Sequence, residues 1–427
     1  MLDDERNVDD KREYSAPRDP VSVVQSANET QVDFESQAYR ELIERSLLNK
    51  GNNVRLKRAI EKARTGDMVN IAYIGGSITH GAGAIPIHLR SYAYLSYEHF
   101  KNRYAPSDGG SINLIKAGVG GTPSELGIIR YDRDILRDGQ VQPDILIIEF
   151  AVNDADDETK GNCYESLVVK ALAADNKPAV ILLFSVFEND WNLQDRLAPI
   201  GWHYDLPMVS MKDALVEQFQ KNPAEGNVIT KEQYFHDIYH PTNLGHRIMA
   251  DTLVHLFEVT DHSVPDEEEQ THEKEPLIGN DFVNVKLLDR KNVDQIARIE
   301  IGAFRHTDTD LQMAEMHDHD YGTPLFPNNW MYNKTGTQER NRFTLHLRCK
   351  RLILIFKDSS SDEFGTANIR VDDEYIKQAD PHQVNWTHCH AMLLFNEDEV
   401  SERKIEIEMA EGYEDKRFTI LGFGYVD

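Results

Sequence analysis

The sequence predicts an α/β domain built on a largely parallel, doubly wound sheet, followed by an all-β domain. Between residues 36 and 260, short apolar segments of strand length alternate with segments of helical pattern. Beyond residue 281 the pattern changes to short β-type segments separated by turn residues. Between them, residues 261–280 hold the acidic run 266–269 and two prolines, which is typical of a linker. A chain of 427 residues is also long for one domain.

The α/β prediction rests on five apolar segments. Residues 69–74 are the clearest example of a buried strand. Five of these six residues are apolar or aromatic, as in strands covered on both faces. We expect strands at residues 69–74, 112–117, 144–150, 179–186 and 207–209. We expect helices within residues 38–65 and at 159–174, 191–200, 211–220 and 243–257. Repeated strand–helix units at this spacing indicate a doubly wound parallel sheet.

The second half predicts a β-sandwich of jelly-roll type. Its β-type segments are residues 297–301, 342–347, 352–356, 367–371, 391–395, 404–409 and 418–425. Residues 1–35 are charged and contain few large apolar side chains, so we expect an arm rather than a domain. The predicted organisation is therefore an arm at 1–35, an α/β domain at 36–260, an acidic linker at 261–280 and a β-sandwich at 281–427.

Composition excludes several classes of function. The net charge of −27 argues against nucleic acid or an anionic membrane as a partner, because both require a basic face. No apolar segment approaches the roughly 20 residues of a membrane span. Three scattered cysteines, with no CxxC pair, argue against a disulfide framework and against a structural zinc site. The charged N-terminus has no apolar core of a secretory signal, so we expect a cytoplasmic location.

Four polar or glycine-rich blocks follow the predicted strands or precede the last helix. They are residues 75–79 (GGSIT), 117–122 (AGVGGT), 149–154 (EFAVND) and 237–246 (DIYHPTNLGH). Carboxyl ends of parallel strands are where open α/β sheets place their ligands, so Ser77 lies in a functional position. The alternative is that Ser77 only caps the helix that follows, as serines at such junctions often do.

The order and content of these blocks resemble the SGNH (GDSL-like) hydrolases, a family of serine esterases and lipases. The resemblance covers residues 69–257 and all four blocks. It implies a flavodoxin-like sheet and a catalytic serine. The family's Gly-Asp-Ser reads Gly75-Gly76-Ser77 here, which is usual in the branch that begins Gly-Gly-Ser-Ile-Thr.

Acyl transfer requires an activated hydroxyl, a base within reach of it and a group that orients the base. The resemblance implies that Ser77 is the nucleophile, that His240 is the base and that Asp237 holds the imidazole ring. The sequence Asp-x-x-His-Pro also places Asp237 and His240 on one tight loop before the last helix. The alternative for His240 is an ordinary loop histidine, since the chain contains 17 histidines.

The oxyanion of the reaction requires preorganised hydrogen-bond donors. We expect the backbone N–H of Ser77, the backbone N–H of Gly121 and the side-chain amide of Asn153, with Gly120 as the alternative to Gly121. A turn after a strand would also explain the glycines, and a helix cap would also explain Asn153. Among neighbouring residues, we expect structural roles for Glu149 and Asp154.

Other candidates carry less weight. His246 is expected to pack or cap on the last helix. Arg130 and Arg133 could brace acidic groups or line the site. Trp191, Trp202 and Tyr204 could wall a substrate cleft, although aromatic side chains are as often core. His388 and His390 suggest a metal site, but histidines two residues apart on a strand more often lie on a solvated face. We therefore expect neither a metal nor a cofactor.

The leading functional hypothesis is a metal-independent serine esterase that removes short acyl groups, most of all acetyl, from a carbohydrate. The acetyl-sugar part rests on the resemblance to bacterial two-domain carbohydrate esterases of acetyl-xylan type. The expected partner is an acetylated small molecule or oligosaccharide, and the sequence leaves open whether the chain forms a homo-oligomer. One alternative is a lipase, thioesterase or lysophospholipase. Another is a non-catalytic flavodoxin-like module that binds phosphate, although its glycine loops lack the GxGxxG pattern.

Overall fold

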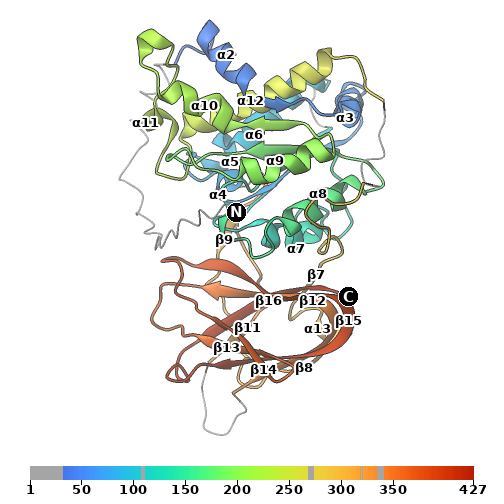
Figure 1. The fold of residues 1–427 in the computed structure, drawn as a ribbon, viewed down its shortest axis with the longest axis vertical. Helices are drawn as coiled ribbons and strands as arrows, with labels where there is room; N and C mark the ends of the chain where they lie inside the picture. Colours follow the sequence, from blue (N-terminus) through green and yellow to red (C-terminus); the bar gives the residue numbers. More distant parts are fainter. Residues whose placement is uncertain (1–31, 107–110, 268–273, 318, 320, 334–340) are drawn as a thin grey trace, which may run out of the picture. The chain divides into compact units, whose positions relative to one another are not determined.

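A computed structural model describes the chain except for residues 1–31, 107–110, 268–273, 318, 320 and 334–340 (Figure 1). Most of the predicted N-terminal arm therefore lies outside the described residues. The chain divides into two compact units. Of the described residues, the α/β unit contains 32–287, Met313–Pro324 and Val426–Asp427, and the β unit contains Leu288–Gln312 and those within Leu325–Tyr425.

The α/β unit is built on a six-stranded sheet with the order β1-β6-β5-β4-β2-β3. Its strands are β1 (Leu47–Asn49), β2 (Val69–Gly75), β3 (Ile112–Gly118), β4 (Ile145–Glu149), β5 (Ala179–Phe184) and β6 (Met208–Ser210). Strands β2 to β6 pair in parallel, and β1 pairs antiparallel with β6 at one edge. This order is that of a flavodoxin-like sheet, so the predicted fold class is confirmed. Strand β1 lies in a stretch that we predicted to be helical.

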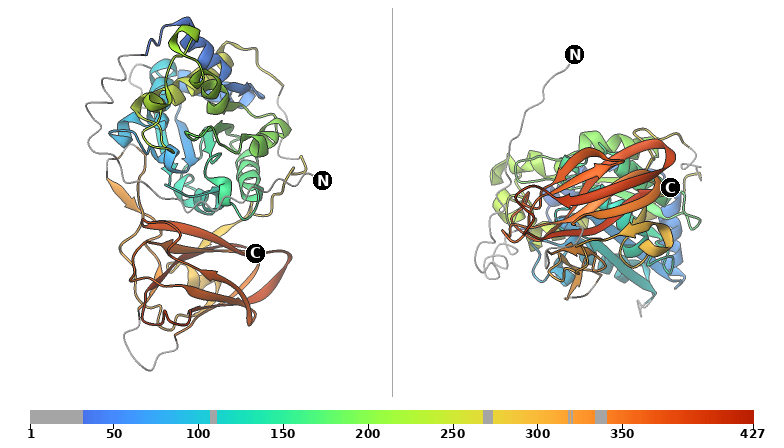
Figure 2. Two further views of the ribbon diagram at one scale, coloured as in Figure 1. Left: turned by 60° about the vertical axis from the view of Figure 1, so that its left-hand side comes forward. Right: turned by 90° about the horizontal axis from the view of Figure 1, so that it is seen from below.

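Helices cover both faces of this sheet (Figures 1 and 2). They are α2 (Gln37–Arg45), α3 (Val54–Arg64), α4 (Ser77–His80), α5 (Ile87–Arg90), α6 (Tyr92–Tyr104), α7 (Ser124–Asp134), α8 (Asn162–Leu172), α9 (Gln194–His203), α10 (Met211–Phe219), α11 (Lys231–Tyr234) and α12 (Asn243–His262). On one face, α2, α3, α6, α10 and α12 share a continuous core with alternate residues of the strands. Alternate residues of a strand point to opposite faces, so the apolar strands need cover on both sides.

The order of the strands decides where a site can form. Strand β2 lies between β4 and β3, and all three run in the same direction. Ser77, Gly121 and Asn153 follow β2, β3 and β4, so they reach the same edge of the sheet. From β2 the chain continues to β3 on one side, and from β4 it continues to β5 on the other side. The carboxyl ends of β2 and β4 therefore form the switch point of the sheet, where such sheets bind ligands.

The β unit is antiparallel, as predicted. Its eight-stranded sheet follows the path β11-β16-β12-β15-β13-β14, with β7 pairing β16 and β8 pairing β12. The strands are β7 (Lys286–Leu288), β8 (Arg298–Glu300), β11 (Trp330–Tyr332), β12 (Phe343–Asp358), β13 (Ala367–Val371), β14 (Glu374–Ala379), β15 (His388–Met409) and β16 (Phe418–Val426). One short helix, α13 (Val293–Ile296), precedes β8.

Two long strands differ from the prediction. Residues 342–347 and 352–356 form one strand, β12, and residues 391–395 and 404–409 form one strand, β15. The register between them shifts near Cys349 to Arg351 and again at Leu352, where bulges interrupt the alternation of apolar residues. Such an interruption resembles a turn when only the sequence is read. Both strands curve along their length (Figure 2).

The predicted linker, residues 261–280, is hydrogen-bonded to the α/β unit near both of its ends. The buried carboxylate of Glu165 on α8 accepts hydrogen bonds from the backbone N–H groups of Leu277, Ile278 and Gly279 at 2.6, 2.5 and 2.8 Å. At the other end of the segment, the Asn53 side chain and the Asp266 backbone N–H are hydrogen-bonded at 2.9 Å. The described residues of this segment therefore bind along the α/β unit.

A hairpin from the second half of the chain also belongs to the α/β unit. Strands β9 (Met313–Glu315) and β10 (Gly322–Pro324) pair antiparallel with each other. Both strands are part of the compact unit that contains the α/β sheet. We predicted neither strand, because each has only three residues.

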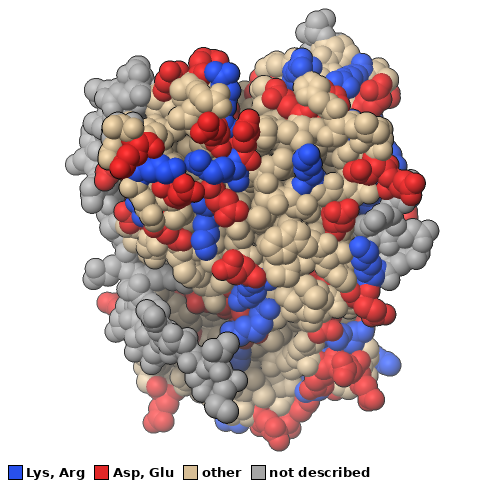
Figure 3. Space-filling model, turned by 45° about the horizontal axis from the view of Figure 1, so that its top comes forward, with Lys and Arg blue, Asp and Glu red and all other residues tan. Residues whose placement is uncertain are grey.

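Charges are mixed on the surface that Figure 3 shows. Lysine and arginine side chains lie among aspartate and glutamate side chains, with uncharged surface between them. In the part of the chain that the structure describes, no helix is long and apolar enough to cross a membrane.

Candidate active site

Ser77 begins the single-turn helix α4 directly after β2. Gly76 is the N-cap of this helix, and no side chain caps it, so the alternative that Ser77 is a helix cap is wrong. The two glycines before Ser77 are required by close packing. A Cβ on Gly75 would lie 2.2 Å from Thr79 Oγ1, and a Cβ on Gly76 would lie 2.0 Å from Asn153 Oδ1. The glycines therefore let the loops after β2 and β4 meet at Ser77.

The structure brings Ser77, His240 and Asp237 together in one chain of hydrogen bonds. Ser77 Oγ lies 2.9 Å from His240 Nε2, and His240 Nδ1 lies 2.8 Å from Asp237 Oδ2. The imidazole is buried, with 5% of the side chain exposed, whereas the Asp237 side chain is 28% exposed. Because a carboxylate can only accept at Nδ1, the ring carries its proton there and presents Nε2 as an acceptor to the serine hydroxyl.

Asp237 is fixed by its own loop. Its Oδ1 accepts hydrogen bonds from the backbone N–H groups of Tyr239 and His240 at 2.7 and 2.8 Å. Burial alone would raise the pKa of Asp237, but the hydrogen bond and charge of His240, together with these N–H groups, lower it below the usual value. The carboxylate therefore stays ionised and holds the ring.

The loop of His240 is closed at its base. The His236 N–H donates to the His240 carbonyl at 2.7 Å, and Phe235 and Pro241 form an isolated antiparallel bridge. Gly83, with a φ of +89°, lies so close that a Cβ there would be 2.1 Å from the Pro241 carbonyl oxygen. These contacts tie the loop that carries the imidazole to the segment after α4.

The predicted oxyanion donors lie at the ends of the two strands beside β2. The Asn153 side chain packs against Gly76, the residue before Ser77. The space that a Cβ on Gly76 would need is occupied by the Asn153 amide. Gly120 and Gly121 form the turn after β3, and Gly121 has a φ of +68° and is exposed. Both predicted positions therefore flank Ser77 at the same edge of the sheet.

Two buried cations near the site were missed or only loosely predicted. The Arg130 guanidinium on α7 donates to the carbonyls of Ala117 and Gly75 at 2.7 and 3.0 Å, and it also pairs with Asp134. The Lys116 ammonium donates to the His80 carbonyl at 3.0 Å, and burial lowers the pKa of this lysine to about 8. A lysine within a predicted buried strand was the only sequence signal for this role.

The hairpin of β9 and β10 binds the end of α4. The backbone N–H of Glu315 donates to His80 Nε2 at 2.9 Å, and the backbone of His317 donates to the Lys116 carbonyl at 3.1 Å. Burial lowers the pKa of His80 to about 4, so this ring is neutral at pH 7 and can accept the hydrogen bond. Nothing in the sequence linked residues 313–324 to the serine, since more than 230 positions separate His80 from its donor.

The expected structural roles of neighbouring residues agree with their contacts. Asp154 accepts from the backbone N–H and the hydroxyl of Ser124, both at 2.7 Å. His246 is buried on α12, where Nδ1 accepts from the Tyr92 N–H and Nε2 lies 3.0 Å from the Ala82 carbonyl. Glu149 Oε2 accepts from the Thr79 hydroxyl at 3.0 Å.

Glu149 makes stability depend on pH. Burial raises the pKa of its carboxyl to about 7, whereas the unfolded chain releases this proton near pH 4.5. As the pH rises from about 4.5 to 7, the unfolded state therefore loses its proton first and the free energy of unfolding falls. Glu149→Gln removes this loss, because the amide never ionises and its oxygen can still accept from Thr79. Between pH 4.5 and 7, we expect the free energy of unfolding of the variant to rise by about 3 kcal/mol relative to that of the wild type.

Urea unfolding of both proteins from pH 5 to pH 8 measures the effect of Glu149→Gln. Glu41→Gln, on an exposed position of α2, is the matched control and should follow the wild type. Parallel curves for the wild type and Glu149→Gln would contradict the prediction.

Aromatic side chains lead away from the imidazole. Tyr239 lies edge-on to His240 at 6.0 Å between ring centroids, Phe187 lies 5.0 Å from Tyr239, and Trp191 stacks on Phe187 at 5.8 Å. Trp191 is half-buried and packs against the core of the α/β unit, so its contacts favour the alternative of a core residue. Tyr204 is buried and donates to Glu165 at 2.9 Å, so it is a core residue and not a wall of the site.

Comparison with known proteins gives an independent indication of the family. Residues 73–248 match the family model described as GDSL-like lipase/acylhydrolase. The match covers four of the five parallel strands of the α/β unit and the site at their ends. The resemblance read from the four blocks is confirmed, and together with the solved esterases described below it identifies the chain as a carboxylic ester hydrolase. The matched region contains Ser77, Gly121, Asn153, Asp237 and His240.

Solved structures extend the similarity over most of the chain. The crystal structure of a two-domain esterase (CEX) active on acetylated mannans has a TM-score of 0.76 and 26% identity, and covers 90% of this chain and 99% of that chain. The same esterase co-crystallized with mannopentaose has a TM-score of 0.73 and 26% identity, and covers 90% of this chain and 98% of that chain. The search of curated proteins found no match.

Proposed function

We propose that this ester hydrolase is a serine esterase that removes acetyl groups from carbohydrates through a covalent acyl-enzyme. The observation that carries the proposal is the hydrogen-bonded chain from Ser77 Oγ through His240 to Asp237. The choice of an acetylated sugar rests on the similarity, over 90% of this chain, to the esterase active on acetylated mannans.

In the proposed first step, His240 Nε2 accepts the hydroxyl proton of Ser77 while Oγ attacks the acetyl carbonyl. The resulting tetrahedral intermediate collapses, its bond to the sugar oxygen breaks, and that oxygen takes the proton from Nε2. Water then attacks the acetyl-serine with its proton going to Nε2, and acetate leaves as Oγ recovers that proton. Asp237 stabilises the imidazolium that forms in both steps.

The developing oxyanion would be stabilised from the ends of the neighbouring strands. We assign the backbone N–H of Ser77, the N–H of Gly121 and the Asn153 amide to this role. Strand order supports the assignment, since β4 and β3 flank β2 and deliver Asn153 and Gly121 to either side of the serine. Such donors act strongly because they are already oriented before charge develops.

Asn153→Ala tests the amide donor. We expect kcat for an acetyl ester to fall by about 10²–10³-fold, because one oxyanion donor of this kind contributes about 2.7–4 kcal/mol to the barrier. KM should change little, since the donor acts on the transition state. Steady-state kinetics on p-nitrophenyl acetate measures both constants. Asn162→Ala is the control, because Asn162 lies on α8 and is hydrogen-bonded to Asp281. An equal loss of kcat in this control would contradict the role of Asn153 as an oxyanion donor.

A panel of defined substrates tests the function itself. We expect acetylated mannooligosaccharides to be deacetylated faster than acetylated xylooligosaccharides, and acetyl esters faster than esters of long acyl chains. Released acetate is the measurement, with Ser77→Ala as the blank. A preference for long acyl chains would instead support the lipase or lysophospholipase alternative.

A further inference from the structure

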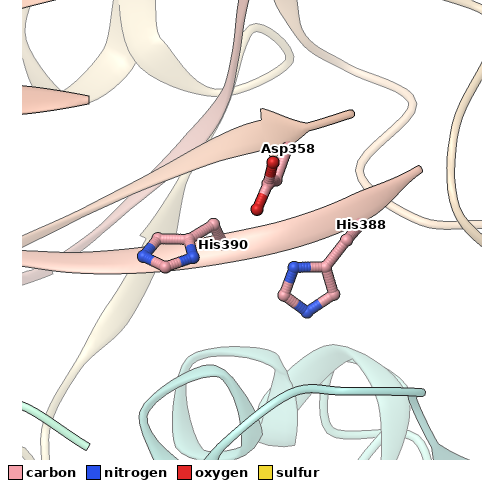
Figure 4. Close-up of side chains that lie close together, drawn as sticks. All are labelled: Asp358, His388 and His390. Carbon is pink, nitrogen blue, oxygen red and sulfur yellow. The ribbon is translucent and has the colours of Figure 1, made fainter. Parts of the chain in front are cut away.

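The β unit contains a cluster of two histidines and an aspartate that the proposed reaction does not use. Asp358 ends β12, and His388 begins β15 as its direct partner across the strand pair. His390 is two residues further along β15 and therefore points to the same face. The ligand atoms of Asp358, His388 and His390 all lie within 4.8 Å of one another. Figure 4 shows the carboxylate directed between the two imidazole rings.

This face of the strand pair is the apolar one. Phe356 and Leu354 continue the row of Asp358, and Met392 continues the row of the histidines, and these apolar residues belong to the core of the β unit. Asp358 is fully buried and His388 is 6% exposed. Our prediction of a solvated face is therefore wrong for His388. A charged residue at the end of a core row requires a compensating partner.

Backbone N–H groups of Gln383, Val384 and Ser359 compensate the Asp358 carboxylate only in part. Its Oδ1 accepts from the Gln383 N–H at 3.1 Å. Its Oδ2 is buried and has no hydrogen-bond partner among the described residues. A carboxylate oxygen in this situation favours a bound cation or a proton.

We propose that Asp358, His388 and His390 bind a divalent transition-metal ion, with Zn²⁺ as the best fit. Two imidazole nitrogens and one carboxylate oxygen form a common zinc ligand set, whereas Ca²⁺ and Mg²⁺ prefer oxygen ligands throughout. Ligand atoms around a tetrahedral zinc lie about 3.4 Å apart. Small side-chain rotations therefore bring the three atoms from their present spacing to bonding distance.

Such an ion would have a structural role. It would join the end of β12 to the start of β15, and so it would close the excursion of residues 359–387 that contains β13 and β14. Cys389 is also buried, but it lies between the two histidines and points to the opposite face of the strand, so it is not a ligand. The proposal is independent of the esterase reaction, since all three ligands belong to the β unit.

Zinc binding to the full chain tests the proposal. The protein is purified without a metal-affinity tag, stripped with a chelator, dialysed, and titrated with Zn²⁺ by calorimetry and with Co²⁺ by visible absorption. We expect one high-affinity zinc per chain, a rise in melting temperature with Zn²⁺ and the absorption bands of four-coordinate Co²⁺. His390→Gln and Asp358→Asn should each weaken zinc binding by about 10-fold or more.

His382→Ala is the matched control, because His382 and Asp380 form an exposed histidine–carboxylate pair in the same unit, 3.0 Å apart. This variant should bind zinc as the wild type does. Wild-type protein that binds no zinc, or a high-affinity zinc that His390→Gln leaves in place, would overturn the proposal. His390 is half-buried and not fully buried, so His390→Gln decides the question even if Asp358→Asn does not fold.

Discussion

Replacing Ser77 with alanine is expected to lower kcat/KM for acetyl esters by about 10⁴-fold or more, while the protein stays folded. The hydroxyl is the only group at this position that can form the acyl-enzyme, and it lies 2.9 Å from the imidazole that would activate it. Its loss should cost little stability, because Ser77 does not cap α4 and loses only one hydrogen bond. Steady-state kinetics and urea unfolding of the variant measure the two effects.

Ser91→Ala separates the loss of a nucleophile from the loss of a helix-opening serine. Ser91 is the N-cap of α6, and its hydroxyl accepts from the Tyr94 N–H. This variant should lose about 1 kcal/mol of stability and retain activity. Labelling by a fluorophosphonate, present in the wild type and in Ser91→Ala but absent in Ser77→Ala, gives a second readout. Labelling of Ser77→Ala would mean that another residue is the nucleophile.

The α/β unit was predictable because its sequence contains two independent signals, the apolar strands and the polar blocks that follow them. Strands buried on both faces need nearly continuous apolar segments, so residues 69–74, 145–148 and 179–184 could be recognised without reference to a partner. The polar blocks follow these strands directly, and parallel pairing then brings Ser77 and Asn153 to the same edge. The order of blocks therefore contained most of the information on the candidate site.

The missing parts depend on contacts between distant segments. The Lys116 side chain, which supports the end of α4, could not be assigned, because its partner is a backbone carbonyl. The hairpin at residues 313–324 binds His80 through the N–H of Glu315, a group that every residue except proline has. The bulges in β12 also leave no distinctive residue type, and so one bent strand was read as two.

Replacing Asp237 with asparagine is expected to reduce kcat by about 10⁴-fold with little change in the fold. The cause is the tautomer of His240. Oδ1 of Asp237 accepts two backbone N–H groups, so in the variant the amide oxygen must occupy that position and the amide NH₂ must face Nδ1. The ring must then accept at Nδ1 and carry its proton on Nε2, where it can no longer accept the proton of Ser77.

The size and pattern of this effect separate orientation of the base from a general loss of charge. Asp132→Asn, which removes an equal charge from a surface ion pair with Lys170, should keep activity within about 2-fold of the wild type, because such pairs contribute little. Asp237→Ala should retain more activity than Asp237→Asn if the tautomer is the cause, since without the amide the ring is free to present an unprotonated Nε2. Equal activities of the two variants would instead assign the loss to the missing negative charge near the imidazolium, and wild-type activity in both would remove Asp237 from the mechanism.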